Sequence, residues 1–198
     1  MAYQPDTETL LAVILGAALA TAGGFGERQI ERAILKKEKE RSAALFFGEL
    51  LSAMRVMMKL ANEARGRGDP FGPITLRFMR SIQREIEIYD RNRETLLDLR
   101  SAAVRASISV LIARLSFALG GVTDATAELA SLGADAPEER RTAIGEIRKT
   151  AFDFAVETAA EITPLLQALA PLAQHNFGST ESALPAGVLS TPAGDSRR

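Results

Sequence analysis

Apolar residues recur every three or four positions along most of this chain, and that spacing limits what it can fold into. Phe47, Leu51, Met54 and Met58 follow this spacing in one segment. Runs of β-branched residues that alternate with polar residues are missing. A spacing of three and four places side chains on one face of a helix. The sequence therefore predicts an all-α fold, with helices at about 27–64, 74–119 and 136–170.

The segment 65–73, RGRGDPFGP, separates the first two of these predicted helices. It contains three glycines and two prolines, a composition typical of a chain reversal. We therefore expect a long antiparallel helical hairpin, which the helix at 136–170 completes as a three-helix bundle. The helix at 74–119 would extend roughly 70 Å, at ~1.5 Å per residue. Pro164 is expected to kink the third helix.

Residues 10–26 form a stretch of 17 residues without a charge. As a helix of ~1.5 Å per residue they would reach about 25 Å, slightly less than the ~30 Å of a bilayer's hydrocarbon layer. Residues 1–9 form a polar lead with two acids and no base, which disfavours a secretory signal. The run therefore predicts a single transmembrane helix.

The charges around this run predict its orientation. Six basic residues follow it before residue 42, and none precedes it. Because positive charge is retained on the cytoplasmic side, the N-terminus would lie outside and the bundle, residues 27–173, in the cytoplasm. The alternative is a soluble bundle in which 10–26 is a core helix, and such a protein could regulate a partner or bind an apolar ligand.

Small residues recur every four positions within the uncharged run. They would form a ridge that lets a second span approach closely, which predicts a homo-oligomer. Chance can also produce such a ridge, because Gly and Ala make up about half of the run. The residues of this oligomerisation hypothesis are Ala12, Gly16, Ala20 and Gly24.

A second contact with membrane lipid follows from the predicted hairpin. If the two helices pair antiparallel along their full length, Glu27 lies near Arg114 and residues 107–122 lie near the cytoplasmic bilayer face. Packing of 107–122 against the third helix is the competing reading. The residues expected at the lipid surface are Arg28, Arg32, Lys36, Lys37, Arg105 and Arg114.

A protein partner is the other expected contact. Met and Phe side chains adapt well to varied partners, so an apolar face of the first helix is a candidate docking face. Its residues are Phe47, Met54, Met57 and Met58. The formal net charge of −1 provides no overall field for nucleic acid, and no nucleic-acid partner is expected.

Catalytic chemistry has few candidate residues. The chain has no Cys and a single His, His175, which removes thiolate chemistry and the commonest general base and metal ligand. The carboxylates of 81–100 alternate with arginines, as in a salt-bridged helix face. We predict no catalytic, cofactor-binding or metal-binding residue and no small-molecule substrate.

The last segment, 174–198, is rich in Gly, Ser, Pro and Ala without periodicity, and it is predicted to be a disordered tail. Together these features predict a non-enzymatic, single-pass membrane protein. Its cytoplasmic helical bundle would serve as a scaffold or interaction module.

Overall fold

The computed structural model describes residues 7–68, 70–133 and 135–177, with side chains from residue 31 onward. Within these residues the chain is helical and has no strand, so the predicted all-α class is confirmed. The elements in order are α1 (Thr7–Gly66), α2 (Pro73–Arg91), the 3-10 helix η1 (Arg93–Asp98), α3 (Ala102–Ser131), α4 (Glu138–Ala160) and α5 (Ile162–Ala173).

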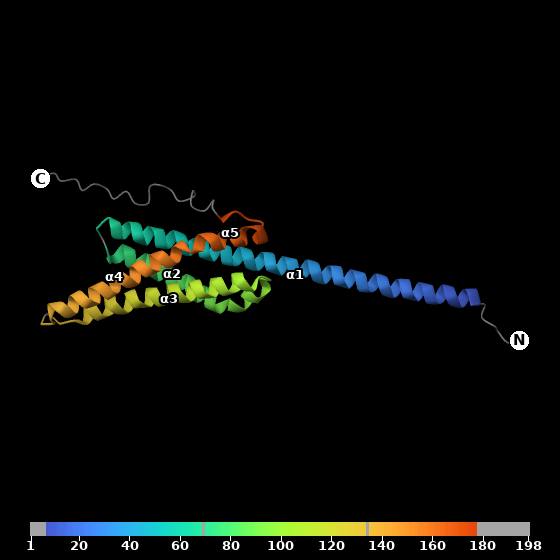
Figure 1. Cartoon of the computed structure of the whole chain (residues 1–198), viewed down its shortest axis with the longest axis horizontal. Helices are drawn as coiled ribbons and strands as arrows, with labels where there is room; N and C mark the ends of the chain where they lie inside the picture. Colours follow the sequence, from blue (N-terminus) through green and yellow to red (C-terminus); the bar gives the residue numbers. More distant parts are fainter. Residues whose placement is uncertain (1–6, 69, 134, 178–198) are drawn as a thin grey trace.

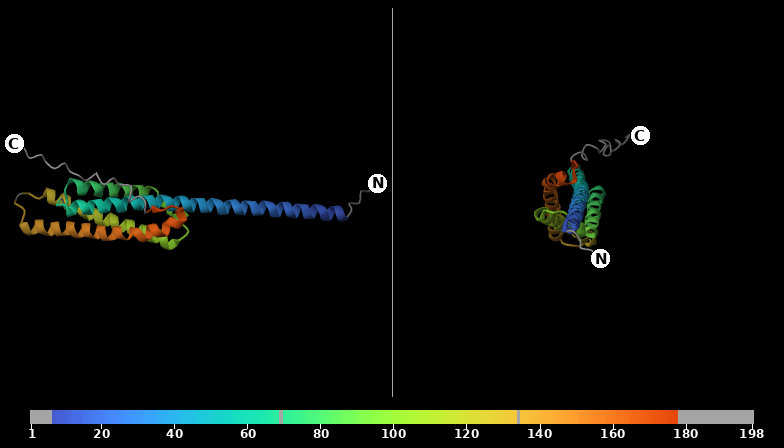
Figure 2. Two further views of the ribbon diagram at one scale, coloured as in Figure 1. Left: turned by 90° about the horizontal axis from the view of Figure 1, so that it is seen from above. Right: turned by 90° about the vertical axis from the view of Figure 1, so that its right-hand side faces the viewer.

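Four helical rods make up the bundle. Figures 1 and 2 show the C-terminal half of α1, then α2, then α3, and finally α4 followed by α5, lying side by side. Consecutive rods run in opposite directions, and α3 packs against α4 while α1 packs against both α2 and α5. The N-terminal half of α1 extends beyond the bundle (Figure 1). The architecture is therefore a four-rod bundle on a long helix, where three packed helices were predicted.

The turn between α1 and α2 lies where the sequence predicts it. Gly68 has φ +95°, a left-handed conformation that glycine adopts without a steric cost. Pro73 begins α2, where its missing N–H costs nothing because the first helical N–H groups have no helical partner. The antiparallel hairpin of α1 and α2 is thus confirmed.

The predicted single helix at 74–119 is wrong. The chain leaves α2 at Asn92, whose side-chain amide donates to the carbonyl of Ile88 at 2.8 Å, and it forms η1 before α3 begins. The hydroxyl of Ser101 accepts from the Val104 N–H at 3.3 Å and caps α3. Leu96 and Leu99 are buried inside this reversal. Burying these two leucines favours folding back over extending a rod of roughly 70 Å.

Two further boundaries differ from prediction. α3 continues through Gly120 and Gly121, where an end was expected. A Cβ on Gly121 would lie 3.2 Å from the Cβ of Ala151, so this glycine permits close packing of α3 on α4. The predicted helix at 136–170 is divided at Glu161, because the ring of Pro164 clashes with a helical carbonyl at Ala160. The expected interruption of this helix by Pro164 is therefore confirmed, and it lies about one turn before the proline.

The bundle core is continuous through all four rods. Its largest fully buried side chains are Phe47, Phe152, Leu51, Met54, Met58, Ile82, Leu99, Ile108, Leu111, Leu115, Leu119 and Ile162. Phe177 is also buried, at 2% exposure, although the sequence assigned it to the tail. The rest of that predicted tail, residues 178–198, lies outside the described residues.

Candidate functional site

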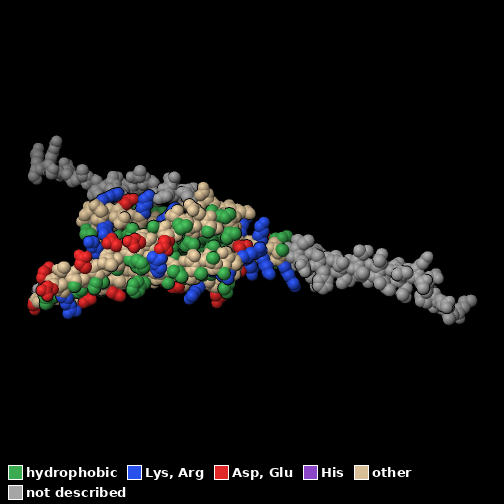
Figure 3. Space-filling model, viewed as in Figure 1, with side chains coloured by type: hydrophobic (Ala, Val, Ile, Leu, Met, Phe, Trp, Pro, Cys, Tyr) green, Lys and Arg blue, Asp and Glu red, His purple; other side chains and the backbone are tan. Residues whose placement is uncertain are grey.

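The longest run of exposed residues among those whose side chains the structure describes lies in the projecting part of α1. Every residue from 31 to 39 is exposed, including the apolar Ile34 and Leu35. Arg32, Lys36 and Lys37, three of the residues expected at the lipid surface, lie in this exposed segment, and Figure 3 shows blue side chains gathered where α1 leaves the bundle. The side chain of Arg28 lies outside the described residues.

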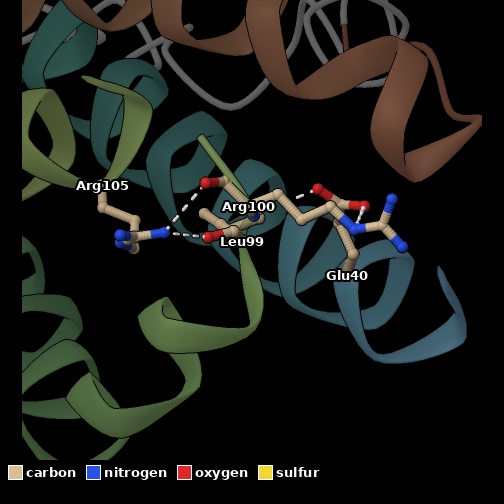
Figure 4. Close-up of polar contacts among 4 residues, drawn as sticks. All are labelled: Glu40, Leu99, Arg100 and Arg105. Carbon is tan, nitrogen blue, oxygen red and sulfur yellow. Dashed lines mark hydrogen bonds and ion pairs between the residues drawn. The ribbon is translucent and has the colours of Figure 1, made fainter. Parts of the chain in front are cut away.

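A polar junction lies at the point where α1 leaves the bundle (Figure 4). A carboxylate oxygen of Glu40 accepts from the backbone N–H of Arg100 at 3.1 Å, and the other oxygen lies 3.2 Å from Arg100 Nε. Arg105 donates to the carbonyl of Leu99 and, at 3.1 Å, to that of Arg100. These bonds join α1 to the turn before α3 and satisfy its backbone groups.

The predicted proximity of Glu27 and Arg114 is wrong. That geometry required an unbroken helix at 74–119, whereas the reversal at 92–101 ends the α1–α2 hairpin near Glu40. Arg114 instead donates to both carboxylate oxygens of Glu161, at 2.7 and 2.8 Å, and lies over the ring of Phe154. Arg105 and Arg114 therefore both serve contacts within the bundle.

The predicted partner face of α1 is largely core. Phe47, Met54 and Met58 are almost fully buried, and Met57 is partly buried against the core. The ring of Phe47 packs edge-on against Tyr89 of α2, with the centroids 6.1 Å apart. Helices of the same chain therefore cover this face, and the prediction that it receives a partner is wrong. The spacing of three and four residues predicted correctly that this face is buried. It could not predict whether a helix of the same chain or a separate partner covers the face.

The predicted span, 10–26, lies in the backbone of α1, and its side chains lie outside the described residues. The same holds for the predicted ridge of Ala12, Gly16, Ala20 and Gly24. Among the described residues, α3 is the one helix apolar and long enough to cross a membrane, with a mean hydropathy of 1.6 over its most apolar window. Only 33% of that window is buried. A helix of a bundle that has a second, exposed apolar face would show the same hydropathy and the same partial burial.

The outward face of α3 is the surface that sequence reasoning missed. Phe117 lies in the segment 107–122, which was expected near the bilayer face or packed against the third helix; it is 79% exposed, and Val110 one heptad earlier is 56% exposed. Beside this face, α3 and α5 border a groove of about 470 Å³. It is lined by Ala106, Ser107, Val110, Leu111, Glu161, Pro164 and Leu165.

Two smaller grooves lie elsewhere on the bundle. One, of about 190 Å³, lies between α1 and the α4–α5 rod and is lined in part by Arg55, Lys59 and Thr163. The other, of about 300 Å³, lies between α2 and α3, where Gln83 donates to the Thr123 hydroxyl at 3.1 Å. In the part of the chain that the structure describes, no three His, Cys, Asp or Glu side chains gather as metal ligands would.

Two ionisable groups are perturbed by their surroundings. Partial burial raises the pKa of Glu85 on α2 above its ordinary value, because a desolvated carboxylate loses hydration. Burial also lowers the pKa of Arg148, whose guanidinium lies 4.0 Å from the ring centroid of Phe71. Arg148 nevertheless remains a cation near neutral pH, and its role is to pack α4 against the turn between α1 and α2.

Comparison with known proteins adds no family. No protein-family model, curated protein or solved structure matches the chain. The functional argument therefore depends on the two surfaces described above. These are the exposed basic segment of α1 and the outward face of α3.

Proposed function

We propose that this chain is a single-pass membrane protein in which α1 continues from the bilayer to a cytoplasmic helical bundle. The bundle acts as a non-enzymatic interaction module. The observation that carries the proposal is the continuity of α1, which extends without interruption from Thr7 to Gly66 and leaves the bundle at Glu40. The uncharged run at 10–26 thus lies in the part of α1 that has no bundle helix beside it (Figure 1).

This placement disfavours the alternative in which 10–26 is a core helix of a soluble bundle. Among the residues whose side chains the structure describes, from 31 onward, the four-rod core begins at Ala43. An uncharged helix of 17 residues with no neighbour would expose its apolar surface to water. A bilayer removes that surface from water at a length that fits with modest thinning.

The segment between the run and the bundle fits the headgroup region. From Gly26 to Glu40 a helix covers about 21 Å, at ~1.5 Å per residue. Arg32, Lys36 and Lys37 in this segment are exposed and would face anionic lipid, which favours a cytoplasmic bundle and an outside N-terminus. A continuous helix would also hold the bundle at a fixed distance from the membrane.

The experiment is alkaline carbonate extraction of membranes that contain the full chain. We expect the chain to remain in the pellet, and the double variant L15R/L19R to enter the soluble fraction, because each Arg at a span's centre costs about 2.5–3.5 kcal/mol. The matched control is I34R/L35R, which adds the same charges to exposed positions of α1 and should stay in the pellet. Release of the native chain by carbonate would refute the proposal.

Orientation is tested separately with single cysteines, because the chain has none of its own. A membrane-impermeant maleimide should label an A2C variant in intact cells and an S196C variant only after lysis. The reverse pattern would refute the cytoplasmic assignment.

A further inference from the structure

The outward face of α3 carries an apolar stripe with the spacing of a helix–helix seam. Its members are separated alternately by three and four residues, which keeps them on one side of a helix that pairs with another. All but the last, which is partly buried, are exposed. This stripe, called the α3 seam below, consists of Ala103, Ala106, Val110, Ala113, Phe117 and Gly120.

The α3 seam lies opposite the face of α3 that faces the core. Ile108, Leu111 and Leu115 fill the core side and are almost fully buried. α3 therefore has one apolar face that its own bundle covers and another that nothing in the described chain covers. Two large side chains, Val110 and Phe117, alternate along the seam with small ones, which allows another helix to approach closely.

Charge does not oppose burial of the seam. Between Arg105 and Asp124 the one charged residue is Arg114, and both of its bonds go to Glu161 within the same chain. Ser107, Ser109 and Ser116 flank the seam. A partner could therefore cover the face without leaving a buried charge unpaired, which is the main cost of such an interface.

The direction of α3 decides which partner fits. Figure 1 shows α3 running alongside the bundle part of α1. A bilayer that holds the N-terminal part of α1 would therefore meet the end of the bundle and not its side. Two copies held in one bilayer, by contrast, would stand with their α3 helices parallel and their sides facing each other.

We propose that the α3 seam pairs with the same seam of a second copy, with the two α3 helices parallel. This inference rests on the proposed membrane anchor. In a parallel two-fold pair each residue of the seam faces its own counterpart, so Phe117 packs against Phe117 and Val110 against Val110. A face that is neutral and apolar along its length is complementary to itself in this arrangement.

Anchoring also supplies the affinity that a seam of this size needs. The seam covers about 26 Å of one helix, at ~1.5 Å per residue. At the ~10 Å width of a helix this strip covers roughly 260 Å², well below the ~800 Å² per partner of a stable soluble dimer. Confinement of both copies to one membrane raises their effective concentration and compensates for the small area.

The test uses single cysteines in the full chain, oxidised in the membrane. V110C and F117C should each form a disulfide-linked dimer in at least tenfold higher yield than I147C, a control exposed on α4. Adding F117E to the V110C chain should reduce its dimer at least tenfold, whereas I147E should leave it unchanged. Phe117 is exposed, so its replacement leaves the fold intact, which circular dichroism checks.

Each result decides the matter when carbonate extraction is run on the same samples. A chain that stays in the pellet but gives no more dimer at Val110 than at Ile147 overturns the pairing and leaves the anchor standing. A soluble chain refutes the anchor. If that soluble chain still cross-links at Val110 and Phe117, the seam pairs without the anchor, and if it does not, the pairing is overturned as well. A mixed A106C and F117C sample that forms only the mixed dimer overturns the parallel arrangement.

Discussion

The ring of Phe177 lies directly against Gly48, so that a Cβ on this glycine would overlap the ring. Phe177 follows the end of α5, while Gly48 lies on α1 about two turns beyond Glu40, where this helix enters the bundle. The Arg41 guanidinium, two turns earlier on the same side of α1, donates to the Ala173 carbonyl at 3.4 Å. The end of α5 is therefore fastened to α1 at two points.

We predict that Gly48→Ala lowers the free energy of unfolding. The new methyl group expels the Phe177 ring, whose burial stabilises the fold by about 1.5–3 kcal/mol, and this exceeds the ~1 kcal/mol that Ala gains over Gly in a helix. Denaturant unfolding followed by circular dichroism measures the change. Hydrogen exchange should also become faster in residues 162–177.

The double variant with Phe177→Ala separates these two effects. Once the ring is absent, Gly48→Ala should raise stability by up to about 1 kcal/mol, because only the helix propensity remains. The sign of the effect of Gly48→Ala thus reverses between the two backgrounds. The same destabilisation in both backgrounds would show that the ring is not the cause.

Glu40 should be required for the junction at which α1 leaves the bundle. Glu40→Ala removes the acceptor for the backbone N–H of Arg100, and we expect a loss of about 1–3 kcal/mol in the free energy of unfolding. Glu40→Gln retains an oxygen acceptor and should lose less. Glu49→Ala, at an exposed position of the same helix, is the control and should change stability by less than about 0.5 kcal/mol.

Arg114 should not tolerate replacement by Lys without a cost. Its guanidinium reaches both oxygens of Glu161 and lies over the ring of Phe154, 5.2 Å from the centroid, and an ammonium cannot reproduce that geometry. We expect Arg114→Lys to lower the free energy of unfolding by about 0.5–1 kcal/mol, a modest value because the pair is partly exposed. Arg140→Lys, which affects a single 3.1 Å contact with Glu128, should cost less in the same assay.

Stability should depend on pH through Glu85. Because burial raises the pKa of this carboxyl in the folded chain, the folded state binds the proton more tightly than the unfolded state does. Its contribution to stability is therefore complete below about pH 4 and is lost as pH rises through the folded-state pKa. Glu85→Gln should raise stability at pH 7 by roughly 0.5 kcal/mol or less, because solvent screens the charge.

The same Gln variant should gain nothing at pH 3.5 or below, where the native carboxyl is already protonated. Asp90→Asn, at an exposed position of the same helix, controls for the loss of one negative charge. An equal gain for Glu85→Gln at both pH values would contradict the assigned cause.

Local sequence alone determined the helical class, the reversal after Gly66 and the break before Pro164. Each of these depends on neighbours within a few residues. Apolar residues spaced by three and four define a helix face, glycine adopts the left-handed turn at Gly68, and a proline ring excludes a helical carbonyl one turn back. The uncharged run and its basic flank are also features of local sequence.

Tertiary structure decided where the second helix breaks and which apolar faces are covered. The sequence around Asn92 contains no Gly or Pro of the kind that ends α1 at 65–73. The reversal there is instead favoured by the burial of Leu96 and Leu99. Gly120 and Gly121 likewise resemble a helix end, yet contact with Ala151 makes them part of a packed interface. Phe47 and Phe117 both lie in apolar stripes spaced by three and four residues, yet Phe47 is buried and Phe117 is exposed. A helical pattern predicts that a face is apolar, and only the arrangement of the other helices decides whether that face is covered.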